Sequence, residues 1–129
     1  MMKTFLNSFF AVALIVLAAC SNAEKAAIIS QQELIARIND NSAPMVLDVR
    51  TAEEFNSGHV PGAIHVPYDN YQQALEPLRL KTTGEVVVYC EKGGRAKKVE
   101  SYLAEQGFSE VRHLEGDMSG WRKASLPVE

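Results

Sequence analysis

The chain has 129 residues, of which 47% are apolar and 22% are charged, so it can form one compact domain with a modest core and is unlike a disordered tail. Lys and Arg total 13 against 16 Asp and Glu, a formal net charge of −3, which argues against a general nucleic-acid-binding protein. Only two cysteines are present, too few for a scaffold of several disulfides or for a zinc site of several thiolates.

The first twenty residues have the pattern of an export signal. Lys3 precedes an unbroken apolar run over residues 9–19, which is shorter than the roughly 20 residues that a helix needs to span a bilayer. The run ends in Leu17-Ala18-Ala19-Cys20, which resembles the lipobox of bacterial lipoprotein precursors. The resemblance implies that residues 1–19 are a signal peptide and that Cys20 carries a lipid. An ordinary secretory signal with an incidental cysteine is the alternative.

A lipidated Cys20 implies a protein anchored at the bacterial cell envelope and facing the periplasm. Ser21 after the cysteine favours the outer membrane, by the sorting pattern of lipoproteins. Residues 20–27 are small and polar without a periodic apolar pattern, which predicts a tether between the anchor and the domain. Because Cys20 is then acylated, the other cysteine has no partner for a disulfide within the chain.

Residues 28–129 predict one α/β domain. Two capping-box spacings, Ser30-x-x-Glu33 and Thr51-x-x-Glu54, mark helix starts, and a third helix is indicated by Ala96, Val99 and Leu103 and ended by Gly107. Between the helical patterns lie five short apolar runs, expected to be strands: 28–29, 45–49, 63–66, 86–89 and 111–114. Strands that are apolar on both faces and alternate with helices predict a central, mostly parallel five-stranded sheet with helices on both faces.

The second cysteine, Cys90, lies at the carboxyl end of the most apolar strand, where open α/β sheets place their sites. Gly93 and Gly94 allow the following backbone to turn its N–H groups inward, and the helix that starts near Arg95 adds its positive end. Between residues 91 and 98 there are four cationic side chains and one acidic one. This surrounding favours a reactive thiolate, whereas the alternative is a cysteine that only packs in the core.

The sequence is similar to the rhodanese (sulfurtransferase) family from about Ile28 to Trp121. Leu47-Asp48-Val49-Arg50 and the later run from Gly58 to Pro67 resemble its first hallmark, and Cys90-x-x-Gly93-x-Arg95 resembles its active-site loop. The Cdc25-type phosphatases share this fold but have five residues between cysteine and arginine. Here four intervene, which suits a terminal sulfur better than a phosphate.

The resemblance implies that Cys90 takes a sulfur atom from a small anionic donor such as thiosulfate and passes it from a persulfide to cyanide or a thiol. The loop residues Glu91, Lys92, Gly93, Gly94 and Arg95 would bind the donor, with Arg95 holding the loop. Asp48 and Arg50 would support the loop by hydrogen bonds rather than contact the substrate. No cofactor, no metal and a monomer are expected.

Three further features bear on the site. His59, His65 and His113 lack the spacing of metal ligands, and His59 is expected to brace the Gly58–Gly62 turn. Trp121 follows Gly116-Asp117, where the family more often has two glycines, so Trp121 is expected in the core or the pocket wall. The competing function is a binding module that uses the same fold at the membrane without catalysis, and the intact cysteine loop favours the enzyme.

Overall fold

The computed structural model describes residues 26–129. The predicted signal peptide, Cys20 and all but the last two residues of the predicted tether lie outside these residues. No helix in the described part is long and apolar enough to cross a membrane. The strands are β1 (Ala27–Ile29), β2 (Met45–Asp48), β3 (Ile64–His65), β4 (Glu85–Tyr89) and β5 (Glu110–Leu114). The α-helices are α1 (Gln31–Asn39), α2 (Ala52–Asn56), α3 (Tyr71–Leu75), α4 (Gly94–Glu105) and α5 (Asp117–Lys123), with two short 3₁₀ helices flanking α3.

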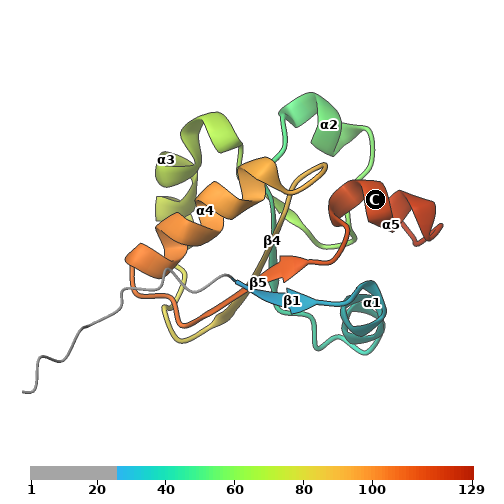
Figure 1. Ribbon diagram of the computed structural model, residues 1–129, viewed down its shortest axis with the longest axis horizontal. Helices are drawn as coiled ribbons and strands as arrows, with labels where there is room; N and C mark the ends of the chain where they lie inside the picture. Colours follow the sequence, from blue (N-terminus) through green and yellow to red (C-terminus); the bar gives the residue numbers. More distant parts are fainter. Residues whose placement is uncertain (1–25) are drawn as a thin grey trace, which may run out of the picture.

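The five strands form one sheet in the order β1-β5-β4-β2-β3, and all four neighbouring pairs are parallel. Figure 1 shows α3 and α4 on one side of the sheet and α1 and α5 on the other. The predicted fold class, a five-stranded parallel sheet covered on both faces, is therefore confirmed. Because all strands run the same way, the segments that follow β2, β3, β4 and β5 meet at one edge of the sheet.

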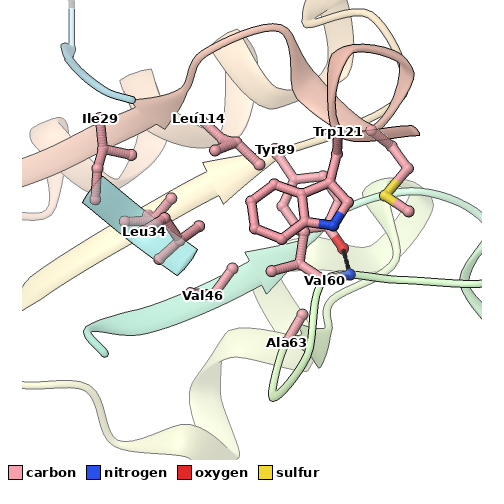
Figure 2. Close-up of a cluster of buried hydrophobic side chains, with 10 residues drawn as sticks. Ile29, Leu34, Val46, Val60, Ala63, Tyr89, Leu114 and Trp121 are labelled. Atoms are coloured by element: carbon pink, nitrogen blue, oxygen red, sulfur yellow. Dashed lines mark hydrogen bonds between the residues drawn. The ribbon is translucent and has the colours of Figure 1, made fainter. Parts of the chain in front are cut away.

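Each face of the sheet buries its own apolar cluster, since successive side chains of a strand point to opposite faces. Val87 and Tyr89 of β4 join the cluster under α1 and α5, which includes Trp121, whereas Val86 and Val88 join the cluster under α3 and α4. In Figure 2, Trp121 and Tyr89 lie beside Val60, and the dashed line joins the Tyr89 hydroxyl to the Val60 amide. Trp121 is fully buried, as expected of a core residue.

Both predicted capping-box residues, Ser30 and Thr51, cap the starts of helices. At Thr51 the complete capping box forms, because its hydroxyl accepts the Glu54 N–H and the Glu54 carboxylate accepts the Thr51 N–H. At Ser30 only the hydroxyl acts, since the Glu33 carboxylate pairs instead with Arg112. The strand boundaries differ slightly from those expected: β1 begins inside the predicted tether, β3 has only two residues of the expected run 63–66, and β2, β4 and β5 each differ by one residue at one end.

Candidate active site

Cys90 directly follows β4 at the edge of the sheet where the carboxyl ends of the strands meet. The residue is 1% exposed, and its Sγ accepts the Gly93 N–H at 3.0 Å. Gly93 has a φ of +111°, a conformation that side chains with a Cβ rarely adopt. As predicted from the sequence, a glycine at position 93 is therefore needed for the turn that directs a backbone amide at the sulfur.

The first turn of α4 supplies further free amides beside this loop. The Lys97 N–H donates to the Gly93 carbonyl oxygen, whereas the N–H groups of Gly94, Arg95 and Ala96 have no partner among the described residues. Unpaired amides at the start of a helix carry its positive partial charge and favour an anion. The loop thus combines one amide already on the sulfur with three that remain available for negative charge.

Arg95 is held by an acidic side chain from a distant part of the sequence. Its Nη1 and Nη2 donate to Glu54 Oε1 at 2.7 Å and Oε2 at 3.1 Å, across 41 residues. Hydrogen bonding to Arg95 lowers the pKa of the Glu54 carboxyl from 4.5 to about 2. The same pair, with a smaller contribution from Cys90, raises the pKa of Arg95.

This pairing changes which charged side chains at the site are free. The sequence count of four cations against one acid considered residues 91–98 alone, and the fold adds Glu54 to the group. Glu91, the acid within the loop, also pairs with Arg122, and its Oε1 lies 3.7 Å from Arg50 Nη1. Lys92 is exposed and carries no ion pair in the described part of the chain. Arg95 and Glu91 are therefore paired rather than free, but because Arg122 and Arg50 join the group together with Glu54, its overall balance stays positive.

Asp48 and Arg50 form a buried ion pair beneath the loop. Arg50 Nε lies 3.0 Å from Asp48 Oδ1 and Nη2 lies 2.7 Å from Oδ2, while Nη2 also donates to the Gly58 carbonyl oxygen at 2.8 Å. The Tyr89 hydroxyl donates to Asp48 Oδ2 at 2.7 Å, and burial together with the Asp48 charge raises the pKa of this phenol. The network joins β2, β4 and the segment after α2, and it places Arg50 against Glu91 of the cysteine loop.

A second buried charged group lies on the other side of the loop and was not predicted. Asp117 Oδ1 accepts the Cys90 N–H at 3.0 Å, and Oδ2 lies 2.9 Å from His113 Nε2. His113 Nδ1 lies 2.5 Å from Glu100 Oε1. Hydrogen bonds to Asp117 and then to Glu100 raise the pKa of His113 from 6.5 to about 10, so the ring is a cation at neutral pH. The unusual Gly116-Asp117 pair was the one sequence signal that pointed here.

The first turn of α5 also holds the main chain of the loop. The Met118 N–H donates to the Cys90 carbonyl oxygen at 3.0 Å, and the Ser119 N–H donates to that of Glu91 at 3.1 Å. The Cys90 backbone is thus fixed by α5 on both its N–H and its C=O. Of the other histidines, His65 Nε2 contacts the Arg50 carbonyl oxygen and His59 stacks on Phe55. No group of three potential metal ligands able to hold an ion occurs within residues 26–129.

Comparison with known proteins agrees with this geometry. A sulfurtransferase of Allochromatium vinosum is 30% identical over 103 residues, covering 78% of this chain and 92% of that protein. Thiosulfate sulfurtransferase 16, chloroplastic, of Arabidopsis thaliana is 38% identical over 93 residues, covering 64% of this chain and 78% of the relative. A tRNA uridine(34) hydroxylase of Photorhabdus laumondii is 32% identical over 74% of this chain, but the match spans only 30% of that longer protein.

Among solved structures, a rhodanese-like domain protein from Staphylococcus aureus superposes with a TM-score of 0.65 at 28% identity, covering 74% of this chain and 90% of that one. Relatives named sulfurtransferases support a general sulfurtransferase role for the chain. The family model of the rhodanese-like domain matches residues 30–124, which include every element from α1 to α5. The chain therefore belongs to the rhodanese-like domain family.

Proposed function

We propose that this chain is a thiosulfate sulfurtransferase that carries the transferred sulfur as a persulfide on Cys90. One observation carries the proposal: the Cys90 sulfur already accepts the Gly93 amide at the start of α4, where three more amides are unpaired. A sulfur anion at this point gains hydrogen bonds that a neutral thiol does not need. The same donors serve the thiolate before the transfer and the persulfide anion after it.

The reaction proceeds in two displacements. The Cys90 thiolate attacks the outer, sulfane sulfur of thiosulfate, a new S–S bond forms, and the original S–S bond breaks with its electron pair leaving on sulfite. A nucleophilic acceptor then attacks the outer sulfur of the persulfide, and the electron pair of that S–S bond returns to Cys90 as thiolate. Cyanide as acceptor gives thiocyanate, and a thiolate gives a new persulfide. The covalent intermediate divides one transfer into two steps.

The enclosure of Cys90 favours a slender donor. With the residue 1% exposed, very little of the sulfur is open to solvent, which favours a terminal sulfur atom presented end-on over a bulky group. The loop has four residues between Cys90 and Arg95, so its ring of amides is smaller than that of the phosphatases that share the fold. Lys92 is exposed at the loop and free to attract an anionic donor.

The proposed location is the bacterial cell envelope. The signal-like residues 1–19 and the lipobox-like segment ending at Cys20 support an anchored protein that faces the periplasm, more readily at the outer than at the inner membrane. In its rhodanese-like domain and its signal-like first residues, the chain resembles the periplasmic rhodanese known as phage shock protein E. The donor and acceptor would then be small sulfur anions and thiols of that compartment, and the domain would act as a monomer.

The proposal is tested by the mass of the intact protein. Incubation with thiosulfate should add the mass of one sulfur atom, cyanide should remove it, and Cys90→Ser should never acquire it. The absence of the adduct at saturating thiosulfate, with a donor panel equally inactive, would refute the proposal. In that case a fully functional Cys90→Ala strain would identify the chain as a binding module.

A further inference from the structure

Asp117 holds a left-handed backbone conformation, which favours glycine and is adopted by few other residue types, mainly Asn and Asp. Its φ is +53°, directly after Gly116 with a φ of +74°. A left-handed conformation costs a residue with a Cβ ~1–2 kcal/mol. Such strain persists where the surrounding structure enforces it, often at functional sites. The carboxylate is also buried, with the residue only 4% exposed. A strained and buried aspartate is expected to make contacts that a glycine could not.

Those contacts lie on the cysteine loop. One carboxylate oxygen accepts the Cys90 N–H, and the other faces His113. A Cβ placed on Gly93 would lie 3.1 Å from Asp117 Oδ2 and 3.5 Å from His113 Cε1. The two side chains therefore form the floor directly beneath Gly93, the residue whose amide donates to the Cys90 sulfur.

The floor is tied to the helix that follows the loop. His113 lies on β5 and Glu100 lies in the second turn of α4, and the two side chains are joined at Nδ1. Glu100 is 6% exposed although Lys98 and Ser101, close to it in the sequence, face the solvent. The hydrogen-bonded chain Asp117–His113–Glu100 thus connects Cys90, where the loop begins, to α4, the helix into which the loop continues.

We propose that Asp117 is a positioning residue for sulfur transfer, which with His113 and Glu100 holds the Gly93 amide against the Cys90 sulfur. Asp117 acts through the loop and does not contact the donor. The effect of Asp117 on the rate of sulfur transfer rests on the proposed function, whereas its effect on the position of the Gly93 amide does not. The alternative is that the carboxylate only stabilises the fold, in which case the Gly93 amide would keep its place without it.

Two variants separate these roles. Asp117→Gly removes the carboxylate and relieves the left-handed strain, so it is expected to fold. Asp117→Asn keeps an oxygen acceptor for the Cys90 N–H and is a residue type that tolerates this conformation. Its amide N–H can donate to Nε2 of a neutral His113 ring whose Nδ1–H still donates to Glu100, so the hydrogen-bonded chain is kept without charge at positions 113 and 117. In ¹H–¹⁵N spectra of the whole protein, the Gly93 amide signal of Asp117→Gly should shift and exchange with solvent about tenfold faster or more, while that of Asp117→Asn stays near wild type. An unmoved Gly93 amide in Asp117→Gly would overturn the proposal.

The same variants are tested in single-turnover sulfur loading from thiosulfate. Because small displacements at a reacting centre cost up to ~100-fold in rate, Asp117→Gly should lower the maximal rate about tenfold or more and leave the half-saturating donor concentration within about twofold. Asp117→Asn should recover most of that rate. A wild-type rate in Asp117→Gly, a defect confined to donor affinity, or an Asp117→Asn as impaired as the glycine variant would each contradict the proposal.

Two controls keep the outcome decisive. If Asp117→Gly shows no cooperative unfolding transition, Glu100→Ala cuts the charge chain at its α4 end and leaves the Asp117 contact with Cys90 in place. A wild-type Gly93 amide in Glu100→Ala would then reject the proposal, and a displaced one would support it. If wild-type protein takes up no sulfur, the proposed function fails, but the Gly93 amide signals still decide whether Asp117 positions the loop.

Discussion

Loss of the His113 proton should make the folded domain lose stability in mild alkali. The pKa of this ring is raised from 6.5 to about 10 because Asp117 and Glu100 hydrogen-bond to its charged form. A raised pKa contributes stability that is complete below pH 6.5 and is lost as the pH rises toward 10. In this interval the folded state binds one proton more than the unfolded state, so the free energy of unfolding falls by up to ~1.4 kcal/mol per pH unit.

The magnitude follows from the two pKa values. Between pH 7 and pH 9, a group whose pKa moves from 6.5 to about 10 accounts for a loss on the order of 2–3 kcal/mol in the free energy of unfolding. A domain of this size has a total stability of roughly 5–15 kcal/mol, so the change is readily measured. The His113 side chain is 12% exposed, so water screens the two ion pairs only weakly.

The assay is urea unfolding of the wild type and His113→Gln at pH 6, 7, 8 and 9. The wild type should show the fall, and the variant should be less stable at pH 7 by about 3–5 kcal/mol, because two buried carboxylates lose their cation. The variant should show a flatter pH profile in the same interval. If His113→Gln does not fold, Asp117→Asn takes its place in the assay. Because His113 then loses one of its two carboxylate partners, the fall of the free energy of unfolding with pH should end at a lower pH than in the wild type. Equal slopes in wild type and variant would refute the assignment of the proton to His113.

Three further outcomes are expected. Glu54→Gln should keep the capping box and free Arg95, so the half-saturating thiosulfate concentration should fall several-fold. The wild type should lose part of its free energy of unfolding as the pH falls from 4.5 to about 2, and this loss should be smaller in Glu54→Gln. The control Glu53→Gln should match the wild type in both measurements. Gly93→Ala would place a Cβ 3.1 Å from Asp117 Oδ2 at a φ of +111°, so the variant should lower the free energy of unfolding in urea by ~1–3 kcal/mol and lose most of the sulfur-loading rate. In the control Gly94→Ala, the added Cβ meets nothing within 4 Å, and both the stability and the loading rate should stay at wild-type values. Arg50→Lys should lower the free energy of unfolding by ~2–4 kcal/mol, because the two-point contact with Asp48 and the bond to Gly58 cannot both be kept; a Tm equal to wild type would contradict this.

Much of the fold was predictable because its signals are local. The Thr51 capping box requires only residues 51–54, and the stripe of Ala96, Val99 and Leu103 shows the buried side of α4 within three turns. Apolar runs between helices were enough to predict a parallel sheet and to place Cys90 at its carboxyl edge. The two glycines after Cys90 likewise predicted a turn, and this turn brings the Gly93 amide to the sulfur.

The electrostatics of the site could not be obtained in this way. Arg95 meets Glu54 from 41 residues away, so the net charge of the loop depends on the tertiary fold and not on the residues 91–98. Glu100 follows a buried valine and precedes a serine, with no pattern to show that it is buried against His113. Asp117 was recognised only as a departure from two glycines, and its contact with the Cys90 amide requires β4 and α5 to be placed together.

The most direct test of the central claim is a crystal structure of the protein after reaction with thiosulfate. One additional sulfur atom is expected, bonded to Cys90 Sγ within the loop of residues 91–95, with the Gly93 amide still directed at the sulfur pair. Thiosulfate-treated crystals in which Cys90 is unmodified, or in which the loop amides turn away from a loaded sulfur, would contradict the claim.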